Sequence, residues 1–199
     1  MADPSQSAAA AAELRLTCRP GKTGNVLTFP YTLENRGPAD IYAMDALPTV
    51  DRADGEPRAD EQAAVVVLAP DGDAILGKFA AALPTDRRIA VPILPLARHV
   101  PAGTSFEGQL EIPLPLAETS PYFAELTLRQ YEVVDIKGVV FTVGYWLAGV
   151  DGLVATPADY VPELFVIATR NTLRSALRVS RRFPTTGLQL FKRTDQFPR

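Results

Sequence analysis

The segment Gly21-Lys22-Thr23 combines residue types that handle phosphate groups. In a phosphate-binding loop, backbone amides cradle the phosphates while the lysine reaches the terminal ones. The full motif also requires a glycine five residues before Gly21, where this chain has Leu16. We therefore interpret the segment as a turn between two strands, with an exposed lysine.

Ser105 is a possible nucleophile, because it lies in the sequence Gly-Thr-Ser-Phe-Glu-Gly at residues 103–108. This sequence misses the Gly-x-Ser-x-Gly pattern of a nucleophile elbow by one residue, and no helical pattern follows it. His99 is the only histidine that could act as its base. A hydrolase that uses Ser105 or surface carboxylates is one alternative. We favour outward strand positions for Ser105 and the carboxylates, and an exposed position near a strand end for His99.

Acidic residues are concentrated between residues 40 and 73, and carboxylates are the ligands that calcium prefers. Their spacing matches no EF-hand loop, because the required later glutamate is missing. We interpret residues 51–62 as a long exposed loop and expect no metal site, although cation binding by this loop stays open. The acidic residues are Asp40, Asp45, Asp51, Asp54, Glu56, Asp60, Glu61, Asp71 and Asp73.

The C-terminal segment is strongly basic, with a net charge of +7 over residues 170–199, whereas residues 1–169 carry −10. This segment could bind nucleic acid, an anionic membrane or an acidic partner. It could equally pack on the acidic loop of its own chain. No nucleic-acid-binding motif accompanies it. The candidate binding residues are Arg174, Arg178, Arg181, Arg182, Lys192 and Arg193.

Composition excludes several classes of protein. The chain has 199 residues, of which 47% are hydrophobic, with one Cys and one His. It has too few Cys and His residues for a disulfide framework or a His-rich or Cys-based metal site, and we expect no cofactor. Residues 1–12 are predicted to be flexible, with no basic start of a secretory signal. No run of 18 apolar residues predicts a membrane span, so we expect a cytoplasmic protein.

Period-two alternation of apolar and polar residues sets the expected fold. Clear alternation occurs in residues 14–18, 26–34, 105–112, 122–129 and 139–147, and shorter β-rich runs occur in residues 40–46, 63–68, 89–94 and 164–169. Pro30 lies within one of these runs, where it predicts an edge strand or a bulge because proline cannot donate to a ladder. Each pattern is typical of an antiparallel sheet with one buried and one wetter face.

Residues 170–182 fit either a short helix capped by Asn171 or a strand. The spacing of Leu173 and Leu177 supports the helix, whereas Leu177 and Val179 would both point inward from a strand. We favour a strand that forms a basic C-terminal hairpin, about residues 170–199, with its turn at 184–187. A helical turn near Asn171 is compatible with that hairpin.

The stretch LTFPYTLENRGPADIY, residues 27–42, resembles the strand-turn-strand signature of bacterial immunoglobulin-like domains, in which an Asn-x-Gly turn joins two early strands. The resemblance covers sixteen residues and implies an immunoglobulin-like sandwich. Such domains are usually binding or scaffolding modules, and the resemblance transfers no functional residue.

These patterns together predict an all-β, immunoglobulin-like antiparallel β-sandwich of about ten strands with little helix, occupying residues 13–199 as a single domain. We expect a non-catalytic accessory module that acts through protein–protein interaction, with a protein partner or through self-association as an oligomer. Polyanion binding by the basic segment is the first alternative and hydrolysis is the second. The sequence identifies no small-molecule ligand.

Overall fold

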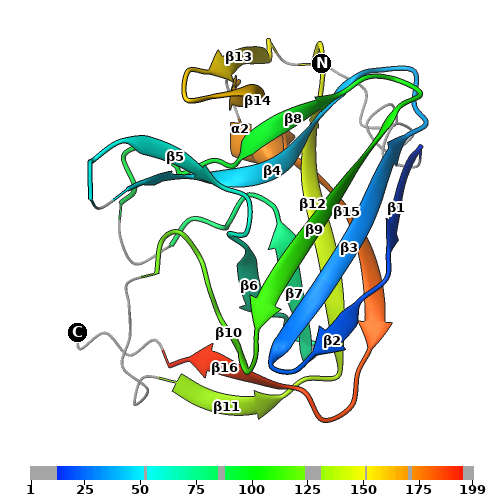
Figure 1. The fold of residues 1–199 in the computed structure, drawn as a ribbon, viewed down its shortest axis with the longest axis vertical. Coiled ribbons are helices and arrows are strands. Elements are labelled where there is room, and N and C mark those ends of the chain that lie inside the picture. The colour runs from blue at the N-terminus through cyan, green and yellow to red at the C-terminus, as the bar shows by residue number, and fades with distance from the viewer. Residues whose placement is uncertain are drawn as a thin grey trace.

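The computed structural model describes residues 13–51, 53–84, 88–123, 131–150, 152–169 and 172–194. These residues form strands and one short helix, α2 (Thr172–Ser175), which confirms the expected all-β class (Figure 1). Sixteen strands occur in the described residues, because several short connecting segments are also extended. The strands are Leu14–Cys18 (β1), Gly21–Thr23 (β2), Val26–Asn35 (β3), Ile41–Val50 (β4), Pro57–Asp60 (β5), Val65–Leu68 (β6), Asp73–Lys78 (β7), Leu96–Val100 (β8), Ser105–Pro113 (β9), Leu116–Ala117 (β10), Tyr131–Asp135 (β11), Gly138–Leu147 (β12), Val154–Ala158 (β13), Val161–Ala168 (β14), Leu177–Pro184 (β15) and Gln189–Arg193 (β16).

The first sheet is built around β3, which pairs with β9 on one edge and with β1 and β2 on the other, all antiparallel. The predicted alternation in β3 is confirmed, since every second residue from Leu27 to Leu33 is buried. Pro30 lies where β1 has ended and β2 has not yet begun, between the partners Tyr31 and Thr28. The missing N–H of Pro30 fits an interruption of the ladder at that point.

The second sheet runs in the order β13-β14-β8-β4-β12-β7-β6, with β15 on the other edge of β12. Along one edge of β12, β7 pairs with Gly138–Val143 and β4 pairs with Tyr145–Leu147, so the sheet forks there. The β7 pairing is parallel, and so is the pairing of β10 with β16. The second sheet and the sheet that contains β10 and β16 are therefore mixed, whereas the first sheet is antiparallel. Alternation reveals which residues are buried but carries no information about strand direction.

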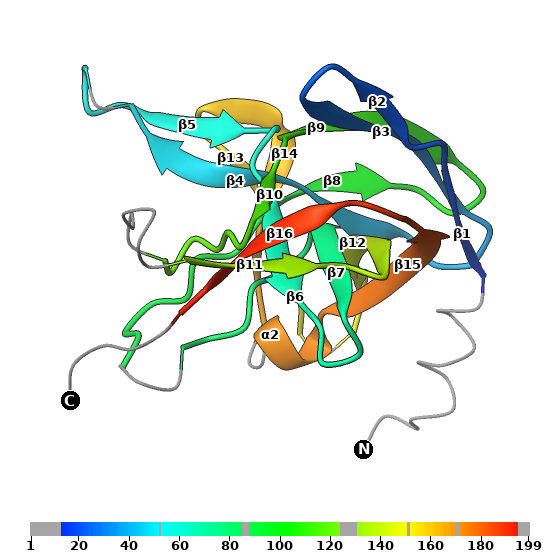
Figure 2. The ribbon, with the colours of Figure 1, turned by 90° about the horizontal axis from the view of Figure 1, so that it is seen from below.

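A third, small sheet of β10, β16 and β11 closes one end of the sandwich (Figure 2). Leu116 and Leu190 from this sheet belong to the main core between the two large sheets. Phe29 and Phe141 stack across that core with ring centroids 5.3 Å apart. A second core lies around Met44, Trp146 and Phe79, so the second sheet buries apolar side chains on both of its faces.

A buried ion cluster lies at the fork of the second sheet. Asp45 on β4 accepts hydrogen bonds at 2.8 Å from Lys78 Nζ on β7 and from Arg98 Nε on β8. The side chains of Asp45 and Lys78 are only 7% and 4% exposed. Burial by itself would raise the pKa of the Asp45 carboxyl, but the two cations hold it below its usual value. The cluster therefore joins three strands through one ionised carboxylate.

Gly77 permits the close approach of β7 to β12 at this fork. Its φ is +142°, and a Cβ added there would lie 2.0 Å from the carbonyl oxygen of Thr142. Any larger residue would push the two strands apart, so glycine is required by both space and backbone conformation.

Three predicted segments differ from the structure. The expected loop at 51–62 contains β5, which pairs with an extended β4 and leaves a tighter turn. The expected strand at 89–94 is irregular, and the strand lies instead at β8; Pro92 removes one donor from the expected ladder. In the expected strand at 122–129, Tyr122 and Phe123 are irregular, and 124–129 lie outside the described residues, as do 1–12.

The C-terminal segment contains both alternatives that its sequence left open, because the short helix α2 precedes the strand β15. Asn171, the expected cap, lies outside the described residues. The expected hairpin does not form: β15 pairs with β12, whereas β16 pairs with β10 and β11 in the third sheet. Local turn chemistry at 184–187 redirects the chain, but more extensive pairing is available with strands distant in sequence.

The described part of the chain contains no helix with the length and apolar character needed to span a membrane.

Replacing Asp45 with asparagine is expected to lower the free energy of unfolding by about 3 to 5 kcal/mol, because Lys78 would remain buried without a carboxylate. Asp54→Asn is the control, since it breaks an exposed pair with Arg58 and is expected to cost about 1 kcal/mol or less. Urea unfolding at neutral pH measures both losses. Equal losses would contradict a structural role for the buried cluster.

The wild type and Asp45→Asn also test how the stability contributed by Asp45 depends on pH. The pKa of Asp45 is lower in the folded chain than in the unfolded chain, where it is about 3.9. Its stabilisation is therefore complete at neutral pH and is lost as the pH falls through the folded-state value. The stability difference between the wild type and Asp45→Asn is expected to stay constant above about pH 5 and to shrink below about pH 4.

Candidate functional site

The six basic residues predicted to bind a partner occupy three different elements. Arg174 lies on α2; Arg178, Arg181 and Arg182 lie on β15; and Lys192 and Arg193 lie on β16. Because β15 and β16 belong to different sheets, the structure does not bring the six side chains onto one strand pair. Their assignment as binding residues stays a prediction.

Two of these arginines cross the outer face of β12 at glycines. Gly138 and Gly144 are Cα partners of Pro184 and Arg178, respectively. A Cβ on Gly138 would lie 3.0 Å from Arg182 Nη2, and one on Gly144 would lie 2.4 Å from Met44 Sδ. Between these positions, the hydroxyls of Thr142 and Ser180 are 2.9 Å apart. Glycines inside a strand are typical of such close approach, and this was the sequence signal that could have identified the crossings.

Arg182 reaches across Gly138 to Asp73 on β7. Its Nε lies 2.5 Å from Oδ2 and its Nη2 lies 2.9 Å from Oδ1, a bidentate pair. These hydrogen bonds hold the pKa of the Asp73 carboxyl below its usual value. Asp73 belongs to the acidic group of residues 40–73, so part of the basic segment is neutralised within the chain.

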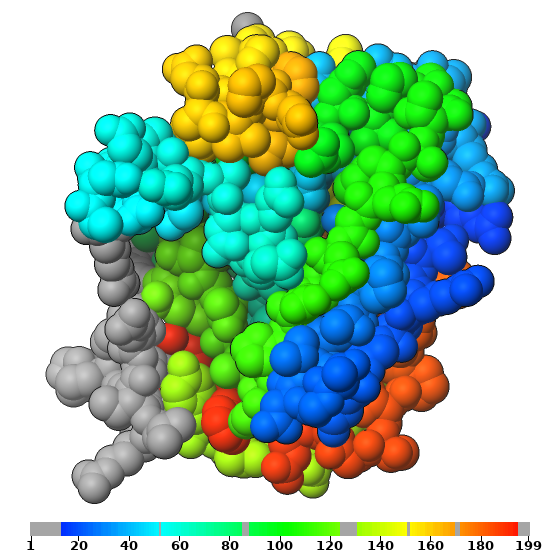
Figure 3. Space-filling view, in the orientation of Figure 1, coloured from blue at the N-terminus to red at the C-terminus, as the bar shows by residue number. Residues whose placement is uncertain are grey.

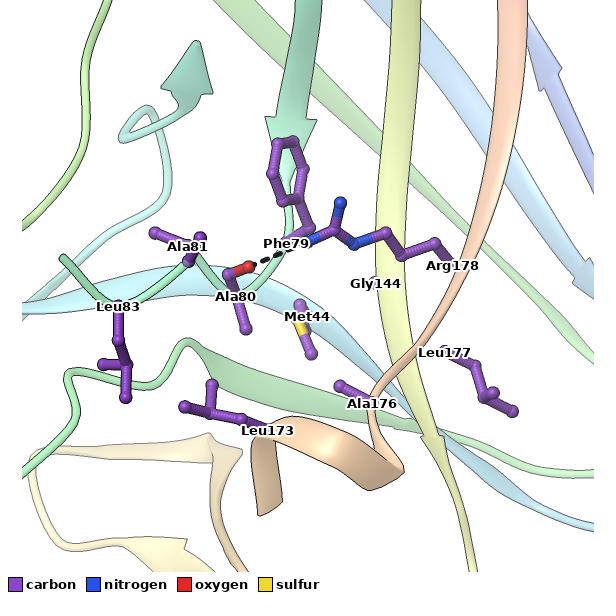
Figure 4. A pocket seen from close by; sticks show the side chains of 11 residues that line it. Met44, Phe79, Ala80, Ala81, Leu83, Gly144, Leu173, Ala176, Leu177 and Arg178 are labelled. Carbon is purple, nitrogen blue, oxygen red and sulfur yellow. Dashed lines mark hydrogen bonds between the residues drawn. The ribbon is translucent and has the colours of Figure 1, made fainter. Parts of the chain in front are cut away.

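Arg178 makes a different set of contacts (Figure 4). Its guanidinium carbon lies 4.5 Å from the centroid of the Phe79 ring, and Nη2 donates to the carbonyl oxygen of Ala80 at 3.1 Å. Arg178 is exposed, but the partial burial of its guanidinium lowers the pKa of this group. Among the described residues, no carboxylate lies within ion-pair distance of Arg178. Among the described residues, therefore, no carboxylate balances the positive charge of Arg178.

The β16 cations are held by local contacts. Arg193 is only 7% exposed, and its guanidinium carbon lies 4.2 Å from the centroid of the Phe123 ring. Lys192 Nζ lies 3.8 Å from a carboxylate oxygen of Glu132. Arg174 and Arg181 are exposed. The basic segment thus combines packed, paired and exposed cations.

His99 and Ser105 do not form a hydrogen-bonded catalytic pair. His99 Nε2 lies 2.9 Å from Asp40 Oδ2, and its ring packs against Tyr42 and Phe165. Asp40 also accepts a hydrogen bond from the amide of Ala102, and these two contacts lower the pKa of its carboxyl. His99 is thus a half-buried group that anchors the turn after β8. Ser105 is exposed at the start of β9, as expected.

The remaining motifs are in positions that fit structural roles. Gly21-Lys22-Thr23 forms the exposed strand β2 and pairs with β3, rather than forming a turn. In the acidic segment, Asp51 and Asp54 pair with Arg58, while Asp60 caps the amides of residues 62 and 63. Within the described residues, no group of three or more metal-ligating side chains comes together.

Comparisons with models of protein families, with curated proteins and with solved structures found no significant match to this chain.

The pairing of Arg182 with Asp73 can be measured with a double-mutant cycle of Arg182→Gln and Asp73→Asn. We expect a favourable coupling that decreases in about 0.5 M salt, because the arginine side chain is half exposed. Arg181→Gln, on the same strand, is the control and should show no coupling with Asp73→Asn. Additive effects of the first pair would contradict the proposed neutralisation.

Cys18 is expected to be chemically inert in the folded protein. It is buried, and burial raises the pKa of its thiol to about 11, so little thiolate exists at pH 8. Reaction with a disulfide reagent such as dithiobis(nitrobenzoate) should be slower in the native protein than in guanidinium by about a hundredfold or more. A rapid native reaction would show that the thiol is accessible.

Proposed function

We propose that this chain is a non-catalytic binding module that acts through protein–protein interaction. The observation that carries the proposal is an exposed apolar face on the hairpin of β13 and β14. Val154 is 58% exposed and Val166 is 47% exposed. Their directly opposite partners, Ala168 and Thr156, are exposed as well. Three of these four side chains are apolar, which is unusual for a strand face in contact with water.

The opposite face of the same hairpin is already occupied. Ala155, Phe165 and Ile167 pack into the second core, so the hairpin is apolar on both faces and only one face is covered. Figure 3 shows the hairpin standing at one end of the molecule next to the β4–β5 hairpin. Ala59 of β5 packs against the cluster that contains Ala158 and Leu164, which supports the base of the exposed face.

The backbone of β13 adds a means of recognition. Within the described residues this strand pairs only with β14, so one row of its backbone groups has no strand partner there. A register shift between Pro157 and Ala158 limits the regular stretch to Val154–Pro157. A partner segment in extended conformation could pair with this edge and place apolar side chains over Val154 and Val166.

Protein binding is preferred to the two alternatives on specific observations. Polyanion binding would use cations of which Arg182 is ion-paired and Arg193 is buried. Hydrolysis at Ser105 would require His99 as its base, but the side-chain hydrogen bond described for His99 goes to Asp40 and none joins it to Ser105. An immunoglobulin-like arrangement and a cytoplasmic location, both expected from the sequence, belong to the same proposal.

The test compares Val154→Asp/Val166→Asp with Val91→Asp, a control at a valine that is 79% exposed outside the hairpin. Partners captured by the wild type and by Val91→Asp should be lost with the double variant, because two buried charges would oppose the interface. Light scattering measures the molecular mass of the three proteins. If the partner is a second copy of the chain, the mass should fall in the double variant and stay at the wild-type value in Val91→Asp. If capture and mass are identical for all three, the hairpin is not the binding surface.

A further inference from the structure

A small cavity adjoins Arg178 on the outer face of the second sheet, away from the exposed valine face. It has a volume of about 180 Å³. Its walls come from four places: β4, the segment that follows β7, β12, and the region from α2 to β15 (Figure 4). They are formed by Met44, Phe79, Ala80, Ala81, Ala82, Leu83, Gly144, Leu173, Ala176, Leu177 and Arg178.

The described side chains that line the cavity are apolar, with one exception. Among the described residues that line it, Arg178 is the only one with a charged side chain, and none carries a carboxylate. One terminal nitrogen of Arg178 donates to Ala80, and the ring of Phe79 supports the guanidinium. The side chain is therefore held in place at the cavity, while further N–H donors of its planar fork are available.

The glycine at position 144 creates the space that Arg178 spans. A Cβ there would lie 3.2 Å from the backbone of Phe79 and closer still to Met44. The absence of a side chain lets Arg178 lie across β12 toward Ala80. The cation of Arg178, from β15, therefore lies beside apolar walls contributed by β4 and α2.

The size and chemistry of the cavity define its ligand. An apolar cavity of roughly 150 Å³ accommodates benzene, so a cavity of about 180 Å³ has room for a six-carbon ring or a branched aliphatic group. A guanidinium fork matches the two oxygens of a carboxylate, and such charge-assisted pairs are stronger than neutral hydrogen bonds. Arg178 is exposed, so a ligand can reach its guanidinium from solvent. A ligand that satisfies both features carries a carboxylate next to one compact apolar group.

We propose that this cavity binds a small monocarboxylate with a compact apolar group, with Arg178 pairing with the carboxylate and the walls from Met44, Leu173 and Ala176 enclosing the apolar group. The proposal adds a small-molecule site to the protein-binding surface and does not depend on it.

Phenylacetate is the probe, and phenylacetamide is its neutral control of nearly the same shape. In a calorimetric or NMR titration of the wild type, phenylacetate is expected to bind saturably with a Kd of about 1 mM or tighter. Phenylacetamide is expected to bind at least about tenfold more weakly, because it cannot pair with the guanidinium. Equal affinities, or no saturable binding of phenylacetate, would overturn the proposal.

Two variants assign the binding to this cavity. Arg178→Gln should reduce phenylacetate affinity by about tenfold or more, whereas Arg181→Gln, which removes an exposed cation on the same strand, should leave it unchanged. Ala176→Leu keeps the charge and fills the cavity, so it should also reduce affinity. Circular dichroism establishes that each variant is folded. If Arg178→Gln does not fold, Ala176→Leu decides, and unchanged affinity in either folded variant would overturn the assignment.

Discussion

The second sheet depends on the carboxylate of Asp45. Two strands share one edge of β12: β7 pairs with its first part and β4 with its last part. At the fork between them, side chains must connect β4 and β7. Asp45 supplies that connection by bonding both Lys78 and Arg98. A buried ion cluster of this kind adds little net stability compared with apolar packing, but removing one member is costly. The cluster links β4, β7 and β8 at the fork.

Close backbone approach is the second constraint on this sheet. Gly77 lets β7 lie against β12, and Gly138 and Gly144 leave the outer face of β12 open to arginines from β15. Arg182 pairs with the carboxylate of Asp73 on β7, and Arg178 contacts the carbonyl oxygen of Ala80 and the ring of Phe79. The edge strand is thereby fixed by side chains that span its neighbour. The same geometry leaves Arg178 of β15 beside a cavity lined by apolar side chains, where its guanidinium is placed to pair with the anion that we propose.

Both proposed binding features lie where other elements cover the second sheet only in part. The β13–β14 hairpin has one apolar face in the second core and one in solvent, because it lies at the end of the sheet order. The cavity lies where α2 and the segment after β7 cover the sheet incompletely. A sandwich with apolar side chains on both faces of one sheet needs an additional covering layer, and gaps in such a layer are available for ligands.

The all-β class and the buried face of a strand such as 26–34 follow from the sequence alone, because period-two alternation there reflects one covered and one wetter face. Residues 139–147 alternate too, but both of their faces are covered in the folded chain. The sequence also located the charge asymmetry and the residues able to carry it. Tertiary structure alone decided strand direction and partners, including the parallel pairing of β7 with β12 and the separation of β15 from β16. It also decided that Arg182 meets Asp73 while Arg178 meets an apolar cavity. Alternation and turn chemistry are local, whereas pairing and ion contacts depend on residues that are distant in sequence and adjacent only after folding.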